Sequence, residues 1–292
     1  MNHRLKTSVF KILDGLPDRL GYFIYHQLQD LIAKLSIEDK IKSTEASYRL
    51  MKKIFDQQQI SLENKIIVEV GSGWAPILPY LFVHDAAVKK VLTYDINKHY
   101  KKKSIKELNK IFEEKYNNQF GDLSGNSNLN EKVNYFPYTN VAEGELKDTD
   151  IIISRFVLEH LSPKDIKKMH QSFENKLKSG SYILHLISPG DHRAYSDKSI
   201  SLYDFLKYSQ QEWDAIQTKF DYHNRLRLPQ YLEILQQNFE MIHLEYTSCV
   251  PESLEYQKFK KINVHEDFKR FSFEEQTAGS INVLLKKKIA FL

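Results

Sequence analysis

The sequence predicts an α/β protein whose core is a mostly parallel, doubly wound sheet. A short apolar run at residues 66–70 ends in glycines, which is typical of a strand that is buried on both faces and followed by a tight turn. Strand patterns and helix patterns then alternate as far as residue 187. Such alternation is typical of parallel strands joined by crossover helices, so it predicts helices on both faces of the sheet.

Residues 1–60 precede this alternation and are predicted to be helical, because apolar side chains recur there at three- and four-residue spacing. One run consists of Leu16, Leu20, Phe23, Ile24, Leu28, Leu31 and Ile32, and a second consists of Tyr48, Met51, Ile54 and Phe55. We expect these helices to form a cap that packs on a core domain spanning residues 61–292.

The alternating part of the chain predicts five strands. They are expected at residues 66–70, 88–94, 132–138, 150–154 and 182–187. The intervening helices are expected at residues 76–84, 97–116 and 162–177, two of them beginning with a proline that suits the first helical turn. A surface loop rich in Asn, Gly and Ser is expected at residues 117–130.

After Pro189 the alternation pauses. Helix patterns at residues 202–216 and 231–235 predict a helical insertion at about residues 196–238. Strand patterns return at residues 241–247 and 280–285, which gives a predicted sheet of seven strands with the insertion between the fifth and the sixth.

The composition excludes several classes of protein. Lys and Arg number 42 against 38 Asp and Glu, and a net charge of +4 is too small to indicate a nucleic-acid partner. The single cysteine, Cys249, excludes an internal disulfide framework. No apolar run approaches the roughly 20 residues that a membrane helix needs, so we expect no membrane insertion and a cytoplasmic location. The sequence indicates no oligomeric state.

A ligand site is predicted at the turn that follows the first strand. Ligands of open parallel sheets bind at the carboxyl ends of the strands, and Gly71 and Gly73 allow the backbone to approach a ligand closely. Asp95 ends the second strand, where a carboxylate can accept hydrogen bonds from both hydroxyls of a ribose. A dinucleotide site prefers glycine at the position of Pro76, which disfavours a nicotinamide cofactor.

At these residues the sequence resembles the class I S-adenosylmethionine-dependent methyltransferases. Their first motif corresponds to Glu69, Gly71, Gly73 and Ala75, with alanine in place of the third glycine, and their second motif corresponds to Asp95. Their fourth-strand motif resembles residues 150–161, which end in Val-Leu-Glu-His-Leu. The resemblance covers roughly residues 65–188. It implies a seven-stranded Rossmann-like sheet ending in an antiparallel pair, and methyl transfer from S-adenosylmethionine with S-adenosylhomocysteine as product.

The resemblance also implies which residues bind the cofactor. Gly71, Ser72 and Gly73 would surround its methionine part, with Glu69 nearby. Asp95 would hold the ribose and Ile96 would flank the adenine. Further contacts are expected after the third strand and at the end of the fourth, from Asn140, Val141 and Ser154.

Two groups of residues are candidates for catalysis. Arg155 and His160 follow the fourth strand. Arg155 could bind an acidic acceptor, and His160 could take part in catalysis or pack the next helix. Asp191 and His192 follow the fifth strand, and a carboxylate that orients an imidazole would make His192 a general base.

The insertion supplies candidate residues for binding the acceptor. They are Arg193, Tyr222, His223, Asn224 and Arg225. Arginine suits carboxylate, phosphate or sugar ligands, although the same residues could equally fasten the insertion to the sheet. Asp191, His192 and His223 could also form a metal site, but no closely spaced ligand pair supports one, so we expect no metal.

The predicted function is methylation of a small molecule or a sugar, at oxygen or nitrogen. Residues 190–227 resemble bacterial methyltransferases, some of them associated with surface polysaccharides, which implies a glycan acceptor. Two alternatives are methylation of RNA and a binding module without catalysis. The fourth strand ends in Ser154-Arg155-Phe156, whereas amino-methylating nucleic-acid enzymes of this fold usually carry Asn or Asp followed by Pro-Pro and an aromatic residue.

Overall fold

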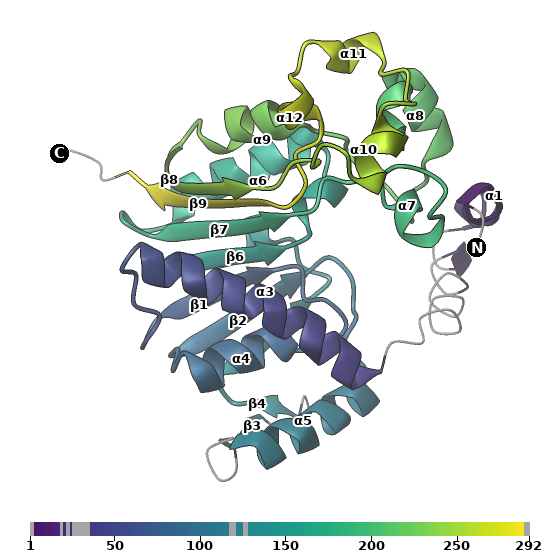
Figure 1. Ribbon diagram of the computed structural model, residues 1–292. Helices are drawn as coiled ribbons and strands as arrows, with labels where there is room; N and C mark the ends of the chain where they lie inside the picture. The colour runs from purple at the N-terminus through teal and green to yellow at the C-terminus, as the bar shows by residue number, and fades with distance from the viewer. Residues whose placement is uncertain are drawn as a thin grey trace.

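The computed structural model describes residues 3–17, 20–21, 24, 36–116, 121–124 and 128–288. Its core is a seven-stranded sheet in the order β5-β2-β1-β6-β7-β9-β8 (Figure 1). The strands are β1 (Ile66–Val70), β2 (Lys90–Asp95), β5 (Val133–Pro137), β6 (Ile151–Arg155), β7 (Tyr182–Ile187), β8 (Phe239–Tyr246) and β9 (Ile281–Lys287). β9 is antiparallel to both of its neighbours, and every other pairing in this sheet is parallel. The predicted fold class, with its final antiparallel pair, is confirmed.

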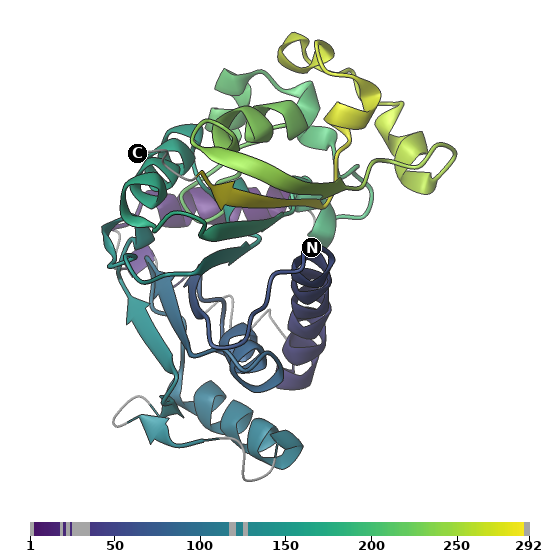
Figure 2. The same cartoon turned by 90° about the vertical axis from the view of Figure 1, so that its left-hand side faces the viewer.

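Helices cover both faces of the sheet (Figures 1 and 2). One face packs on α3 (Ile37–Gln57), α4 (Ile77–Asp85) and α5 (Lys102–Tyr116), and the other packs on α6 (Pro163–Lys176) and α9 (Leu228–Leu235). Successive strand residues point to opposite faces, so Ile151 and Ile153 belong to the first core cluster and Ile152 to the second. This is why the central strands are continuously apolar rather than alternating.

The two described N-terminal helices pack in different places. α1 (His3–Asp14) lies beside the insertion, where Phe10 is 6.2 Å from Phe220 between ring centroids and Asp14 pairs with Lys219. α3 packs on the sheet together with α4, and the ring of Tyr48 is edge-on to the ring of Phe82 with their centroids 5.1 Å apart. Much of the predicted helical run from Leu16 to Ile32 lies outside the described residues. Part of the predicted loop at 117–130 lies outside them as well. The described part of that loop contains the short strands β3 (Leu123–Ser124) and β4 (Leu129–Asn130).

The insertion after β7 contains four short helices. They are α7 (Arg193–Ser196), the 3₁₀ helix η5 (Asp204–Lys207), α8 (Gln210–Ile216) and α9. The single helix expected at residues 202–216 is therefore wrong. Ser209 caps a new helix there, since its hydroxyl accepts from the Glu212 amide while the Glu212 carboxylate accepts from the Ser209 amide.

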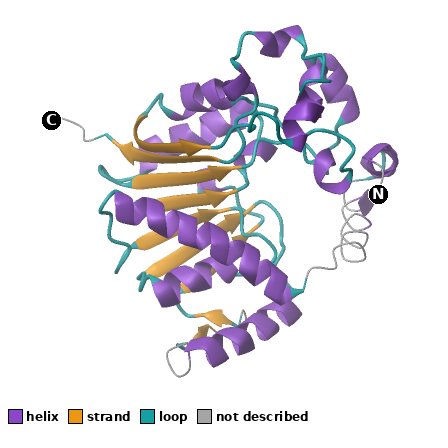
Figure 3. Cartoon of the chain, in the orientation of Figure 1, coloured by secondary structure: helices purple, strands orange, loops and turns teal. Residues whose placement is uncertain are grey.

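A second helical segment joins β8 to β9 and was not predicted. It contains α10 (Leu254–Phe259), α11 (Glu266–Lys269) and α12 (Phe273–Gln276), which are too short to show helical periodicity in the sequence. The two segments share an apolar cluster of Tyr203, Phe205, Leu206, Trp213, Cys249, Phe259 and Phe268. Together they form a helical layer at one end of the sheet (Figure 3). No helix within the described ranges is long and apolar enough to cross a membrane.

Candidate cofactor and acceptor site

Exposed apolar side chains line the carboxyl edge of the parallel strands. One such residue follows each of β1, β2, β5, β6 and β7, with exposed fractions from 38% to 73%: Trp74, Ile96, Tyr138, Phe156 and Tyr195. Tyr138 and Phe156 also have a φ of 57°, a left-handed conformation that bulky side chains rarely adopt. Such strained backbone is concentrated at functional sites, and ligands of parallel sheets bind at this edge. The edge is therefore the candidate site.

The turn after β1 requires both of its glycines. Gly71 has a φ of +82°, and its amide donates to the Tyr94 carbonyl at 2.9 Å. A Cβ atom there would lie 2.6 Å from Cγ2 of Val157, so only glycine fits between β1 and the loop after β6. Gly73 has a φ of +59° and no heavy atom within 4 Å of a Cβ position, which leaves open space on the outer side of the turn.

Asp95 lies against this turn, as expected from the sequence. Its Oδ2 accepts from the Ser72 amide at 2.8 Å and from the Ser72 hydroxyl at 3.1 Å, and its Oδ1 accepts from the Asn97 amide at 2.8 Å. The structure thus brings Gly71, Ser72, Gly73 and Asp95 together at the ends of two neighbouring strands. A fixed carboxylate beside an open, glycine-lined turn fits a nucleoside whose ribose hydroxyls donate hydrogen bonds.

Glu69 and Arg155 lie beneath and beside the turn. Glu69 is 4% exposed and accepts from the Thr93 hydroxyl at 2.8 Å, and burial raises the pKa of its carboxyl group to about 8. Arg155 instead reaches α3, where its Nε donates to the Ser47 hydroxyl at 2.7 Å and its NH2 donates to the Ser43 hydroxyl at 2.9 Å. Arg155 therefore joins the end of β6 to α3, and these contacts give it a structural role that the sequence did not suggest.

The other expected cofactor residues lie in three different environments. Ile96 is exposed on the carboxyl edge. Asn140 caps the 3₁₀ helix η3 (Val141–Glu143) by accepting from the Ala142 amide, and Val141 is buried in the core. Ser154 is fully buried, and its hydroxyl is 2.6 Å from Nδ1 of His185, whose Nε2 is 3.1 Å from Nε2 of His170. The Ser154 hydroxyl is thus part of a buried polar chain.

Three imidazoles gather where the chain leaves β6 and β7. His160 ends the 3₁₀ helix η4 (Leu158–His160), His192 follows β7, and His223 belongs to the insertion. Their ring centroids are 5.0 Å apart for His160 and His192, 4.6 Å for His192 and His223, and 5.9 Å for His160 and His223. The sequence analysis had already grouped His192 with His223 as candidate metal ligands, but it did not indicate that His160 joins them.

Glu159 lies beside these rings and is fully buried. Its Oε1 accepts from the Ser188 amide at 3.2 Å, and burial raises the pKa of its carboxyl group to about 8. The sequence placed Glu159 next to His160 but assigned it no role in the site. The only available signal was its place in the motif next to His160.

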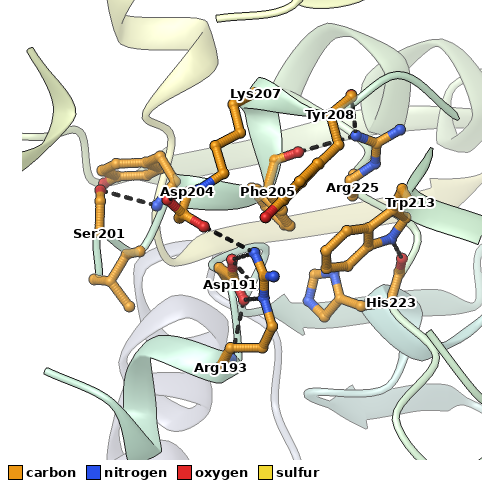
Figure 4. A network of polar contacts seen from close by, with 12 residues as sticks. Asp191, Arg193, Ser201, Asp204, Phe205, Lys207, Tyr208, Trp213, His223 and Arg225 are labelled. Atoms are coloured by element: carbon orange, nitrogen blue, oxygen red, sulfur yellow. Dashed lines mark hydrogen bonds and ion pairs between the residues drawn. The ribbon is translucent and has the colours of Figure 1, made fainter. Parts of the chain in front are cut away.

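Asp191 has a different partner from the one expected. Both of its carboxylate oxygens accept hydrogen bonds from Arg193, at 2.6–3.1 Å, and Arg193 also pairs with Asp204 at 3.1 Å (Figure 4). The predicted pair in which Asp191 orients His192 is thus replaced by a buried ion pair. Arg193, whose guanidinium lies 4.9 Å from the Trp213 ring centroid, is committed to this network rather than directed at an acceptor.

Most of the expected acceptor-binding residues fasten the insertion instead. Arg225 donates to the carbonyls of Phe205 and Tyr208 at 2.9 and 2.6 Å. Asn224 donates to the carbonyls of Leu158 and Leu161 at 2.6 and 2.8 Å. The Tyr222 carbonyl lies 3.0 Å from Nδ1 of His160. Of the two readings that the sequence left open, these contacts favour the structural one.

Comparisons with known proteins give structural likenesses only. No protein-family model matches the sequence, and no curated protein matches it. The chain is similar to a proposed sarcosine dimethylglycine methyltransferase from Galdieria sulphuraria, with 16% identity and a TM-score of 0.49 over 83% of this chain and 86% of that one. It is also similar to the magnesium protoporphyrin IX methyltransferase of Synechocystis PCC 6803, solved with bound S-adenosylhomocysteine, with 12% identity and a TM-score of 0.47 over 87% and 89% of the two chains.

The strand order defines the fold. The parallel strands follow the order β5-β2-β1-β6-β7, and the antiparallel β9 separates β7 from β8. This chain has the Rossmann-like fold of the class I S-adenosylmethionine-dependent methyltransferases.

Proposed function

We propose that this protein transfers a methyl group from S-adenosylmethionine to a small-molecule or sugar acceptor. The observation that supports the cofactor most directly is Asp95, whose carboxylate is fixed against the Gly71-Ser72-Gly73 turn at the carboxyl edge of the sheet. The same turn leaves open space at Gly73, where the backbone can approach a ligand.

Each part of the cofactor has a residue that suits it. Asp95 would accept hydrogen bonds from the ribose hydroxyls, and the exposed Ile96 would flank the adenine. Gly71 and Gly73 would allow the methionine part to lie close to the backbone. The sulfonium group of the bound cofactor supplies an activated methyl group.

The acceptor would bind at the ends of β6 and β7, next to the cofactor turn. Val157, which follows β6, packs on Gly71, so the loop that carries His160 adjoins the turn. His192 and Tyr195 follow β7 on the same edge, and the Tyr195 hydroxyl lies 3.0 Å from that of Ser188. Methyl transfer depends mainly on aligning the acceptor and excluding water, and aromatic and imidazole side chains suit both tasks.

Calorimetric titration of the folded protein with S-adenosylmethionine tests this proposal. Asp95→Ala is expected to weaken binding by about 1–3 kcal/mol, or roughly 5- to 150-fold, because it removes the acceptor for the ribose hydroxyls and for Ser72. Asp148→Ala, at an exposed position before β6, serves as the matched control and is expected to bind normally.

A folded wild-type protein that does not bind S-adenosylmethionine would exclude the proposed activity. Unchanged affinity in Asp95→Ala would instead remove Asp95 from the cofactor site and leave the cofactor itself in place.

A further inference from the structure

Four side chains that can bind a metal ion meet beside the acceptor region. Glu159, His160 and His192 each offer a ligand atom, and these atoms all lie within 4.8 Å of one another. The ring of His223 lies 4.6 Å from that of His192. We propose that Glu159, His160, His192 and His223 bind one divalent first-row transition-metal ion.

The arrangement of the imidazole rings fits a shared ion. Three imidazoles on a tetrahedral ion with metal–nitrogen bonds of about 2.0–2.1 Å would have ring centroids about 5 Å apart. The three observed separations lie between 4.6 and 5.9 Å. Ligand atoms of one such ion are about 3.4 Å apart, so Glu159, His160 and His192 would close by at most about 1.4 Å on binding, and His223 would join them by a movement of its ring. His160 is exposed and His192 is half-buried.

Two of the four side chains bury polar atoms that the fold does not satisfy. His223 is 3% exposed, and neither of its ring nitrogens has a hydrogen bond of ordinary geometry within the described part of the chain, although the Ser188 backbone lies near the ring. The Oε2 atom of the fully buried Glu159 is likewise without a partner among the described residues. Buried polar atoms are normally hydrogen-bonded, and a bound ion is one of the recognised reasons for an exception. An ion bound among the imidazoles would satisfy them.

Hydrogen bonds from neighbouring groups orient the proposed ligands, as they do around metal ions in other proteins. His160 has its Nδ1 at 3.0 Å from the Tyr222 carbonyl, which makes Nδ1 the donor and leaves the Nε2 lone pair for an ion. The Asn224 amide donates to the Glu159 carbonyl at 2.9 Å, which ties η4 to the segment that carries His223. The Ser188 amide holds Oε1 of Glu159, so Oε2 is directed elsewhere.

The donor set indicates the kind of ion. Imidazole nitrogens suit zinc, cobalt and their neighbours, whereas magnesium and calcium prefer oxygen ligands only. Three nitrogens and one carboxylate oxygen therefore favour Zn²⁺ or Co²⁺ over Mg²⁺ and Ca²⁺. If the acceptor binds where the proposed function places it, the ion would also face the acceptor; this consequence rests on the proposed function.

Titration of untagged, chelator-treated protein with Co²⁺ tests the proposal. We expect a visible d–d absorption that saturates at one equivalent and disappears when Zn²⁺ displaces the cobalt. His192→Ala and Glu159→Gln should each weaken Co²⁺ binding by more than about 100-fold, because changes outside the ligand shell alone cost about 10- to 100-fold. His243→Ala removes a histidine on β8 that lies near Glu245 and should bind Co²⁺ normally.

Circular dichroism is used to check that each variant is folded. Because His192 is only half-buried, His192→Ala is expected to fold even if a substitution at the buried Glu159 does not. The proposal is overturned if the folded wild type gives no stoichiometric absorption, or if both variants bind Co²⁺ as the wild type does. S-adenosylmethionine titration of the same metal-free protein is run in parallel. Cofactor binding without cobalt binding would reject only the metal site, and cobalt binding without cofactor binding would reject only the methyl transfer.

Discussion

Replacing Asp191 with alanine is expected to lower the free energy of unfolding by about 3–5 kcal/mol, because it leaves a buried guanidinium without its main partner. Asp191 is 1% exposed and accepts three hydrogen bonds from the Arg193 side chain. Asp204, the other carboxylate near Arg193, also pairs with Lys207 and cannot replace the lost contacts. Urea denaturation followed by circular dichroism measures the change.

Asp56→Ala provides the matched control for this prediction. Asp56 also pairs with a cation at 2.6 Å, but its partner Lys52 is on an exposed face of α3, so the loss should not exceed about 1 kcal/mol. Joint replacement of the buried pair by Asp191→Leu and Arg193→Met should recover much of the stability, since neither side chain then leaves a charge unpaired. Equal losses in Asp191→Ala and Asp56→Ala would show that the buried pair does not hold the insertion in place.

Gly71→Ala is expected to lower the free energy of unfolding by about 2–5 kcal/mol. About 1–2 kcal/mol comes from placing a Cβ atom on a residue with a φ of +82°, and about 1–3 kcal/mol comes from the contact at 2.6 Å with Val157. Because Val157 precedes the helix that carries Glu159 and His160, the same change should displace the acceptor side of the site. Thermal and urea denaturation give the stability, and calorimetry gives the affinity for S-adenosylmethionine.

Gly180→Ala separates the two causes. Gly180 has nearly the same φ, +80°, but open space around its Cβ position, so only the backbone term of about 1–2 kcal/mol should remain. Adding Val157→Ala to Gly71→Ala removes the close contact and should return the unfolding energy toward that of Gly180→Ala. If Gly71→Ala and Gly180→Ala lower the free energy of unfolding by the same amount, the close contact with Val157 does not contribute to the loss.

The glycine turn with Asp95 beside it could be predicted because its signals are local. Gly71 and Asp95 are only 24 residues apart in the sequence, and the positive φ angles of Gly71 and Gly73 favour glycine at both positions. Parallel pairing of β1 with β2 then places them side by side, with Val70 opposite Tyr94. No long-range packing has to be known to bring them together.

The acceptor side could not be predicted in the same way, because its partners are chosen in three dimensions. Adjacency in the sequence suggested that Asp191 serves His192, yet the Arg193 side chain folds back and takes both carboxylate oxygens. Arg225 looked like a ligand for an anion, but burial among the insertion helices makes backbone carbonyls its partners. A sequence pattern shows which charged and polar groups are present. It does not show which of them pair with one another once they are buried.

The sequence by itself determined the sheet and the glycine turn, because hydrophobic periodicity and glycine conformation are properties of short segments. Only the tertiary structure decided the rest. It joined two helical segments on either side of β8 into one apolar cluster, and it brought His160, His192 and His223 together from three separate segments. Contacts of this kind depend on how distant elements pack, so they exist only once the whole chain has folded.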